Sequence, residues 1–544
     1  MSERPMPDTT EVLIIGAGFA GMYLLHRMRG LGIAAQVLEA GDGVGGTWYW
    51  NRYPGARCDV ESMQYSYAFS EELQQEWDWS ERFAAQPEIL RYANHVADRL
   101  DLRRDIAFNS RATAGDFDEA SESWLVTTEA GRRITTRHLI LATGCLSSAR
   151  LPDIPGIGDF AGQIYHTGQW PHEGVDFSGQ RVAVIGTGSS AIQAIPVIAR
   201  EAAHLTVFQR TPNFSIPSRN GPMTEDYAQS WKQDYAARRA AARQMRTGIL
   251  YNLSRTPAME VSEAERRAEY EARWAAGGTA FMAAFADLLT NRAANDTAAE
   301  FVREKIRGLV KKPEVAEILV PKNHPIGTKR ICVDTAYYET FNLPHVKLVD
   351  VHQSPITRIT AEGVEAGGTR HAVDSIVFAT GFDAMTGTIL AMDLRGRDGV
   401  SLRDVWADGP RTHLGLMVAG FPNLFMITGP GSPSVLSNMI VSIEQHVDWV
   451  TDALAHLRAQ GLSTMETTLQ AQEDWVAHVN EVAHRTLYPQ ANSWYMGANI
   501  PGKPQLFMPY VGGVGTYREI CDEIAAGGYP GFRLTARRQA EAAE

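Results

Sequence analysis

Two stretches of the chain share a pattern in which a buried apolar strand runs through a glycine turn into a helix. In the first, the apolar run EVLII is followed by GAGFAG and then by MYLLHRMRGL, whose apolar positions have helical spacing. The turn supplies the positions of a dinucleotide-binding motif, namely Gly16, Gly18, Ala20 and Gly21. The next strand ends in Glu39, where a carboxylate can accept hydrogen bonds from a ribose diol. This unit is therefore predicted to bind an unphosphorylated adenosine ribose, as in FAD.

The second stretch, RVAVIGTGSSA followed by SAIQAIPVIAR, repeats the pattern with a different strand end. Its motif positions are Gly186, Gly188 and Ala191. Its second strand ends in Arg210, whose guanidinium is a planar fork for a phosphate, so this unit is predicted to bind the 2′-phosphate of NADPH. Thr211 and the distant Lys329 are candidates to share that phosphate. The alternative is that Arg210 is a solvated charge at the end of a strand.

Two further apolar runs, HLILATG and SIVFATG, each predict a buried strand that enters a tight glycine turn. If both pass close to a cofactor, the chain builds part of one domain, inserts a second and returns to the first. The predicted fold is α/β, with two Rossmann-like dinucleotide-binding domains. The predicted segments are the first part of an FAD-binding domain at 1–145, an NADPH-binding domain at 146–379, and the rest of the FAD-binding domain with the C-terminal region at 380–544.

Between about 222 and 312 the composition changes to Ala, Arg and Glu with few β-branched residues, which favours helices. Ser262 and Glu265 form a capping box that marks the start of one of them. We expect a helical insertion in the NADPH-binding domain, as a lid or flank, and the sequence assigns it no chemistry.

Composition and charge narrow the class of protein. The chain has 544 residues, which suggests two or three domains, and its 44% hydrophobic and 21% charged residues are typical of soluble globular proteins. The net charge of −12 and the lack of a basic run argue against a nucleic-acid partner. A polar start and the lack of 18 consecutive apolar residues argue against a secretory signal and a membrane span. The four cysteines form no Cys-x-x-Cys pair, so we expect free thiols, no metal site and a cytoplasmic location.

Charged residues near the predicted flavin unit are candidates for catalysis. Asp59 lies in the stretch GGTWYWNRYPGARCDVES, where a carboxylate in apolar surroundings requires a partner. Lys329 and Arg330 in PIGTKRICVD are candidate partners, although a surface basic pair is their alternative interpretation. Trp48 and Trp50 offer flat apolar faces to a cofactor, and ordinary core packing explains them equally well.

One segment between the two units, FAGQIYHTGQWP, resembles a family fingerprint. It fits the pattern F-x-G-x-x-x-H-T-x-x-W-P of type I Baeyer–Villiger monooxygenases at Phe160, Gly162, His166, Thr167, Trp170 and Pro171. The similarity extends over nearly the whole chain, through GGTWYWNRYPGARCD, FQRTP, GTKR, ATGFD, GPGSPS and SWYMGANIPGKP. Within the family, these motifs are most similar to those of the phenylacetone and steroid monooxygenases.

The resemblance implies an FAD-containing, NADPH- and O2-dependent enzyme that converts ketones to esters or lactones through a C4a-peroxyflavin. It implies that Arg330 stabilises the negative charge of the peroxide and of the tetrahedral adduct, and that Asp59 holds and orients Arg330. Aryl-aliphatic, cyclic and linear ketones all remain open as substrates. The expected partners are small molecules, a ketone and O2, and the expected state is a monomer.

The resemblance also implies binding residues. On the flavin side these are Gly46, Thr47, Trp48, Arg57, Cys58, Asp59 and Tyr65. On the NADPH side they are Thr187, Ser189, Ser190, Gln193, Arg210, Thr211, Lys329, Arg330 and Trp494. An apolar substrate pocket is expected along GSPSVLSNM, at Ser434, Val435, Leu436 and Met439, with ordinary packing at a helix start as the alternative. The fingerprint segment is expected to be a domain linker in which His166 has a structural or conformational role.

Two other functions are consistent with a pair of nucleotide units. A flavin-containing N- or S-monooxygenase shares both units, but it uses a protonated hydroperoxide as an electrophile and does not need the Asp–Arg arrangement. A non-catalytic flavoprotein that binds NADPH is also compatible, because nucleotide folds host non-enzymatic functions. The fingerprint together with Asp59 and Arg330 favours the ketone oxidant over both.

Overall fold

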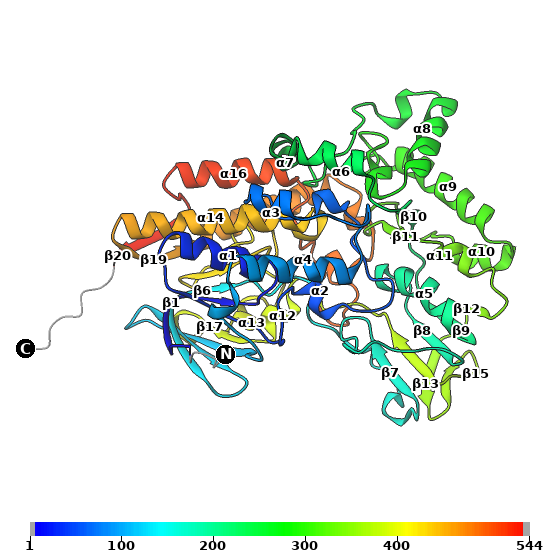
Figure 1. The fold of residues 1–544 in the computed structure, drawn as a ribbon, viewed down its shortest axis with the longest axis horizontal. Helices are drawn as coiled ribbons and strands as arrows, with labels where there is room; N and C mark the ends of the chain where they lie inside the picture. The colour runs from blue at the N-terminus through cyan, green and yellow to red at the C-terminus, as the bar shows by residue number, and fades with distance from the viewer. Residues whose placement is uncertain (1–5, 537–544) are drawn as a thin grey trace, which may run out of the picture.

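The first sheet contains the predicted flavin unit. The computed structural model describes residues 6–536, and within them this sheet has eight strands in the order β17-β4-β5-β6-β1-β2-β3, with β18 paired to β6. The strands are β1 (Thr9–Ile15), β2 (Ala35–Leu38), β3 (Ile106–Ala107), β4 (Ala112–Asp118), β5 (Ser123–Thr128), β6 (Arg133–Leu141), β17 (Asp393–Arg395) and β18 (Leu424–Met426). Helix α1 (Phe19–Gly30) follows β1, and the long helix α14 (Met439–Ala459) lies beside α1 (Figure 1).

The second sheet is parallel throughout and contains the predicted NADPH unit. Its order is β12-β9-β8-β16-β7. The strands are β7 (Gln163–His166), β8 (Arg181–Ile185), β9 (His204–Gln209), β12 (Val346–Asp350) and β16 (Ser375–Phe378). Helix α5 (Ser189–Glu201) follows β8 and packs on one face, while β13 (Ile356–Thr360), β14 (Gly363–Ala366) and β15 (Thr369–Ala372) pack on the other. Because both faces of this sheet are covered, its strands are continuous apolar runs. The predicted α/β class with two Rossmann-like cores is confirmed.

The helical insertion packs against both units. Its helices are α6 (Glu225–Lys232), α7 (Tyr235–Gln244), α8 (Glu263–Ala276), α9 (Arg292–Leu309) and α10 (Pro313–Leu319). The capping box at Ser262 begins α8. Trp231 and Tyr235 of α6 and α7 join the core of the first unit, whereas Trp274 of α8 joins the core of the second. The insertion is expected as a lid or flank of the NADPH unit, and α6 and α7 in addition bury their aromatic side chains on the flavin side.

The remaining elements connect and flank the two sheets. The helices are α2 (Thr47–Trp50), α3 (Glu71–Glu76), α4 (Gln86–Arg99), α11 (Tyr337–Thr340), α12 (Gly387–Leu390), α13 (Leu402–Val405), α15 (Leu469–His484) and α16 (Val514–Ala526). Two small sheets pair β10 (Ser215–Pro217) with β11 (Cys332–Asp334), and β19 (Leu462–Thr467) with β20 (Phe532–Ala536). Among residues 6–536, no helix is both long and apolar enough to cross a membrane. The predicted segments 1–145 and 380–544 extend into residues 1–5 and 537–544, which lie outside the described residues.

Candidate active site

The turn after β1 allows close approach of a dinucleotide. Gly16 has a φ of +107°, and a Cβ there would lie 2.6 Å from the carbonyl oxygen of Ala142. A Cβ on Gly21 would lie 1.9 Å from the Gly16 oxygen, so neither glycine can be replaced without movement of backbone. Ala20 is buried in the first turn of α1, whose free N–H groups face this loop. A helix start of this kind binds phosphates.

Glu39 lies directly after β2 at the same edge of the sheet. Its side chain is buried, and its carboxylate accepts hydrogen bonds from the Ala17 N–H at 2.7 Å and the Gly41 N–H at 2.8 Å. Two backbone donors leave further lone pairs on the carboxylate. The residues around the turn therefore fit the phosphates and ribose diol of FAD.

A second glycine loop closes against this turn and carries the predicted flavin aromatics. Gly46 has a φ of +54°, and a Cβ there would lie 2.9 Å from the Gly18 Cα. Helix α2 then begins at the exposed Thr47. The Trp48 Nε1–H donates to the Tyr65 hydroxyl at 3.1 Å, and the two rings meet edge to face. Trp48 and Tyr65 thus form one wall beside the nucleotide turn.

The turn after β8 repeats this geometry in the second unit. Gly186 has a φ of +112°, and a Cβ there would lie 2.5 Å from the Ala379 oxygen at the end of β16. A Cβ on Gly188 would meet no described atom within 4 Å, which leaves the turn open on its outer side. The Thr187 hydroxyl donates to the Thr211 carbonyl at 3.0 Å and so ties this turn to the end of β9. The turn is shaped for a second dinucleotide.

Two cations lie close together at the end of β9. Arg210 is exposed directly after this strand, and Lys329 is half-buried. Burial lowers the pKa of Lys329, and the nearby charge of Arg210 lowers it further, with no carboxylate in the described part of the chain offsetting this repulsion. A phosphate between the two would stabilise both charges. The donor set therefore fits the 2′-phosphate of NADPH.

Arg330 and Asp59 form a bidentate ion pair. The Arg330 Nε donates to Asp59 Oδ2 at 2.6 Å and Nη2 donates to Oδ1 at 2.8 Å. Their side chains are 29% and 23% exposed, so each remains accessible to a small ligand. Arg330 precedes β11, which is fixed by pairing with β10, and Asp59 lies in the loop after α2. The fold therefore joins the two units at this pair.

The pair remains ionised because each partner stabilises the charge of the other. Burial on its own would raise the pKa of Asp59, but the Arg330 guanidinium holds it below its usual value. Burial likewise disfavours the charged form of Arg330, and Asp59 more than offsets this, so the pKa of Arg330 is raised well above its usual value. The site thus contains a permanent, oriented cation.

The predicted substrate loop lies against this cation. The Arg330 Nη1 donates to the Val435 carbonyl at 2.7 Å. Ser434 is fully buried with a φ of +37°, and its hydroxyl donates to the Thr428 carbonyl at 3.3 Å. Val435 is buried in an apolar cluster against which Leu436 and Met439 pack. The structure brings the predicted substrate loop to Arg330.

The start of α5 contacts the flavin-side loop. Ser189 and Ser190 open the helix, and the Gln193 side chain lies one turn later. Gln193 Oε1 accepts from the Tyr53 hydroxyl at 2.8 Å, and its Nε2 donates to the Arg57 carbonyl at 3.1 Å. The predicted NADPH contact of Gln193 stays a prediction, since in this structure its amide bridges the two units.

Two more predicted flavin residues have structural contacts. The Arg57 guanidinium donates to Glu81 at 2.7 Å and to the Phe83 carbonyl at 2.8 Å. Cys58 is buried, and its sulfur accepts from the Val60 N–H at 3.4 Å. Burial is the main cause that raises the pKa of the Cys58 thiol, so this thiol is neutral.

The first half of the fingerprint segment is a strand. Phe160 packs against the apolar cluster between the second sheet and β13–β15, and a Cβ on Gly162 would lie 2.7 Å from the Phe160 ring. Strand β7 then pairs with β16 and ends at His166, which is buried and accepts from the Gly168 N–H through Nδ1 at 3.0 Å. Burial lowers the pKa of His166, so its imidazole is neutral at physiological pH. The segment is therefore more than a linker, because it supplies the edge strand of the NADPH unit.

The second half of the segment reaches the flavin unit. Thr167 is fully buried, and Trp170 packs in the core of the second unit. Pro171 is followed by His172, whose ring packs edge to face on the ring of Tyr49 in α2, with the ring centroids 4.9 Å apart. This turn therefore contacts both units.

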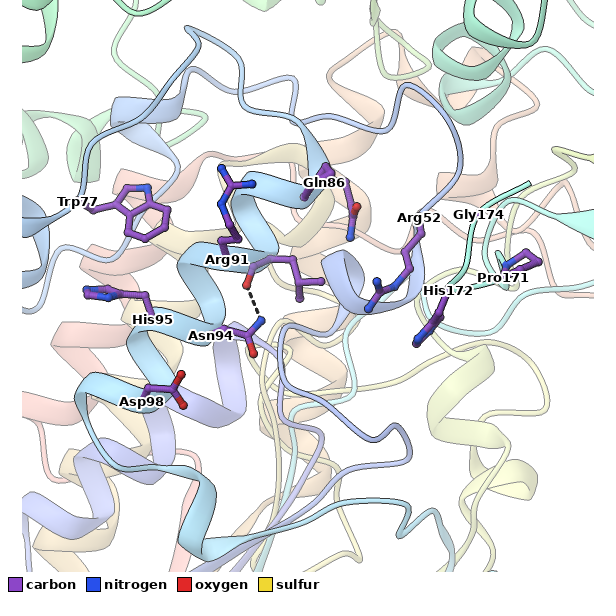
Figure 2. A pocket seen from close by; sticks show the side chains of 12 residues that line it. Arg52, Trp77, Gln86, Arg91, Asn94, His95, Asp98, Pro171, His172 and Gly174 are labelled. Carbon is purple, nitrogen blue, oxygen red and sulfur yellow. Dashed lines mark hydrogen bonds between the residues drawn. The ribbon is translucent and has the colours of Figure 1, made fainter. Parts of the chain in front are cut away.

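A surface pocket of about 700 Å³ lies beside this turn, away from the ion pair (Figure 2). Figure 2 shows Arg91 and His95 on α4 at one side, and Arg52 and His172 at the other. Its remaining lining residues are Trp77, Gln86, Pro87, Leu90, Asn94, Asp98, Pro171 and Gly174. Except for Pro171, none of them is a predicted site residue, and the pocket marks the junction of the two units rather than the reaction centre.

The sequence did not single out two tyrosines near Arg330. Burial raises the pKa of Tyr251 to about 12, and the Arg330 and Asp59 charges act on it from nearby. Burial also raises the pKa of Tyr495, on which the same pair acts. The predicted Trp494 lies next to Tyr495, with ring centroids 4.3 Å apart. Tyr251 lies in no quoted motif, and the motif SWYMGANIPGKP contains Tyr495 without indicating its place beside the pair, because distant segments bring both tyrosines there.

The chain is similar to known flavoprotein oxygenases over nearly its whole length. A family model described as pyridine nucleotide-disulphide oxidoreductase matches residues 13–241. Acetone monooxygenase (methyl acetate-forming) from Gordonia sp. (strain TY-5) is 43% identical over 531 residues, covering 97% of this chain and 99% of that protein. A structure of oxidized steroid monooxygenase bound to NADP is 51% identical, covers 97% of this chain and 100% of its own, and has a TM-score of 0.93. This chain belongs to the Baeyer–Villiger monooxygenases. It is an NADPH-dependent flavoprotein monooxygenase with FAD as its second cofactor.

One relative of this Baeyer–Villiger monooxygenase has a name that indicates different chemistry. Phenazine N-monooxygenase PhzNO1 from Lysobacter antibioticus is 41% identical over 528 residues, covering 96% of this chain and 97% of that protein. Oxygenation of nitrogen is therefore a specific second candidate, whereas a non-catalytic flavoprotein has no support among these relatives.

Proposed function

We propose that this chain oxygenates a ketone to an ester or lactone beside the Asp59–Arg330 pair, with NADPH as reductant and O2 as oxidant. The observation that carries the proposal is the bidentate pair, which holds a permanent cation against the substrate loop. Nucleophilic attack on a ketone places negative charge on its oxygen. A preorganised guanidinium stabilises that charge most in the transition state.

The residues of the two glycine turns would hold the cofactors. Glu39, Gly46, Thr47, Trp48 and Tyr65 are assigned to FAD, and the turn after β8 with Gln193, Arg210, Thr211, Lys329 and Trp494 is assigned to NADPH. When bound, FAD would supply the redox chemistry that links NADPH to O2. The protein's own contribution is to hold both nucleotides, exclude water and supply the oriented cation.

Arg330 has donors left for a substrate oxygen. A guanidinium has five N–H groups, and three of them are engaged by Asp59 and Val435. The other two are free to bind the developing oxyanion while Asp59 keeps the plane of the guanidinium fixed. In this proposal Asp59 orients Arg330, and no histidine acts as an acid or base.

The substrate contacts and the division of the chain are also part of the proposal. Ser434, Val435, Leu436 and Met439 line an apolar site for the carbon groups of a ketone, since this loop contacts Arg330. An apolar site discriminates weakly between ketones that differ by one methylene, at roughly 1–3 kcal/mol each.

The FAD-binding segments are 1–145 and 380–544, and the NADPH-binding segment is 146–379. The working unit is a monomer in the cytoplasm.

Product analysis tests the proposal. The purified flavoprotein is incubated under air with NADPH and a panel of aryl-aliphatic, cyclic and linear ketones, and products are identified by mass spectrometry. We expect products heavier than the ketone by one oxygen, with ester fragmentation. An aromatic N-heterocycle in the same panel tests the second candidate, and an N-oxide without any ester would favour it.

A further inference from the structure

Helix α7 of the insertion places a buried arginine against the loop that carries Tyr65. Arg239 is 5% exposed. Its Nη1 donates to the Gln64 carbonyl at 2.5 Å, and its Nη2 donates to the Met63 carbonyl at 2.8 Å and to the Ser66 hydroxyl at 2.6 Å. The guanidinium therefore binds the residues on both sides of Tyr65.

This cation is bound to neutral oxygens rather than to a carboxylate. Within residues 6–536, the hydrogen bonds of Arg239 go to two backbone carbonyls and one hydroxyl. Glu444 of α14 is buried nearby and accepts instead from the Ala68 N–H at 2.5 Å. The Arg239 guanidinium at the carbonyls of residues 63–64 and the Glu444 carboxyl group at the Ala68 N–H thus hold the same loop at two points. Burial lowers the pKa of Arg239, the nearby Glu444 offsets part of this effect, and the three hydrogen bonds fix the guanidinium against the loop.

Gln64 joins this loop to two other segments. Its carbonyl also accepts from Asn438 Nδ2 at 2.8 Å, and its side-chain oxygen accepts from the Leu250 N–H at 2.8 Å. Asn438 lies within the substrate loop and caps α14, and its N–H donates to the Thr247 carbonyl at 2.7 Å. The insertion, the flavin-side loop and the substrate loop therefore meet at Gln64.

Tyr65 connects this junction to the reaction centre. Its hydroxyl accepts from Trp48, and the charges of Asp59 and Arg330 reach it. Resting on the proposed function, we propose that Arg239 is a positioning residue: through Gln64 and Ser66 it fixes the Tyr65–Trp48 wall of the flavin site in register with the substrate loop. The insertion thereby has a role in the reaction, although it supplies no reacting group.

Substitution of Arg239 tests this role. We compare Arg239→Met, which removes all three bonds, and Arg239→Lys, which keeps the charge but loses the planar fork. The matched control is Arg238→Met on the same helix, because the Arg238 guanidinium pairs with Asp234 and lies over the Trp231 ring, both within the insertion. Each purified variant is first checked for folding by circular dichroism.

Five readouts separate positioning from general stability. For Arg239→Met we expect the rate of ester formation at saturating ketone to fall about tenfold, because misplaced reacting groups react more slowly. The KM for NADPH should change by less than about twofold. Hydrogen peroxide released per NADPH should rise correspondingly. The visible absorption spectrum of bound FAD should shift, and the Kd of the apoprotein for FAD should rise, with Arg239→Lys intermediate and Arg238→Met unchanged.

The outcomes distinguish this inference from the proposed function. Folded Arg239→Lys and Arg239→Met variants with wild-type FAD spectra, FAD affinity and coupling would overturn the positioning role. If Arg239→Met does not fold, Arg239→Lys decides between the same two results. A wild-type protein that forms no ester would overturn the proposed function, and the FAD spectrum and FAD affinity would still decide the inference.

Discussion

Arg330 and Asp59 are 271 positions apart in the sequence and form two parallel hydrogen bonds of 2.6 and 2.8 Å. A bidentate pair fixes the plane of the guanidinium as well as the position of its charge. A third donor reaches the Val435 carbonyl, so the orientation of Arg330 is set from the flavin side and from the substrate side together.

Arg330→Ala should separate the two halves of the reaction. NADPH should still reduce the bound flavin, whereas ester formation should slow by on the order of 3 kcal/mol or more, because a fixed oxyanion donor is lost. Anaerobic stopped-flow absorbance measures the first step, and gas chromatography of the product measures the second. Arg330→Lys keeps a positive charge but loses the planar fork, so its rate of ester formation should lie between those of the wild type and Arg330→Ala. Normal ester yield from Arg330→Ala would exclude this role.

Arg210→Ala should weaken the preference for NADPH over NADH. Loss of a charged bond to the 2′-phosphate should raise KM for NADPH roughly tenfold or more and leave KM for NADH nearly unchanged. Steady-state kinetics with both nucleotides measure the ratio. Arg200→Ala is a matched control, since Arg200 is an exposed arginine on α5. An unchanged ratio in Arg210→Ala would identify Arg210 as a solvated strand-end charge.

His166→Ala should lower turnover and coupling while FAD remains bound. His166 ends β7 and organises the turn that contacts both units, so its loss should disturb their relative position rather than remove a proton carrier. The measurements are kcat, peroxide per NADPH and the FAD content of the purified protein. Unchanged kinetics would remove the conformational role, whereas an ionisation below pH 6.5 in the kcat–pH profile of the wild type that the variant lacks would point to acid–base work instead.

Buried histidines should make the fold sensitive to acid. Burial, with a smaller effect of a neighbouring arginine, lowers the pKa of His138 and of His446 to about 3 each. In the unfolded chain these histidines bind protons near pH 6.5. Their contribution to the free energy of unfolding is therefore complete above that pH and is lost as the pH falls toward 3. At pH 5 each histidine lowers the free energy of unfolding by about 2 kcal/mol. Urea unfolding at pH 7 and pH 5 measures this loss. The His446→Gln side chain can still accept from the Thr428 N–H. This variant should lose about 2 kcal/mol less unfolding free energy between pH 7 and pH 5 than the wild type. The same loss in the variant and in the wild type would show that His446 does not cause the acid sensitivity.

Local patterns predicted the two nucleotide units, because strand, turn and helix follow one another directly in the sequence. The steric demand is local too, as a Cβ on Gly21 would collide with the oxygen of Gly16 only five positions away. The residues alone offered both Lys329 and Arg330 as candidate partners of Asp59, and only the family resemblance selected Arg330. Nothing near either residue specifies the other, since β11 and the loop after α2 are brought together by the topology.

Arg239 illustrates what the sequence cannot predict. It lies in YAARRAAARQ, which has the composition of a solvated helix face, and its partners are backbone carbonyls that leave no trace in residue type. The packing of α6 and α7 on the flavin unit was missed for a similar reason. Their aromatic side chains indicate a buried face but not which core receives it.

Oxygen labelling of the product tests the central claim most directly. The wild-type flavoprotein is incubated with NADPH, a ketone and isotopically labelled O2, and the product is analysed by mass spectrometry. Incorporation of one labelled atom into an ester or lactone, and none from water, is the result predicted here. Consumption of NADPH with release of hydrogen peroxide alone, for every class of ketone, would contradict it.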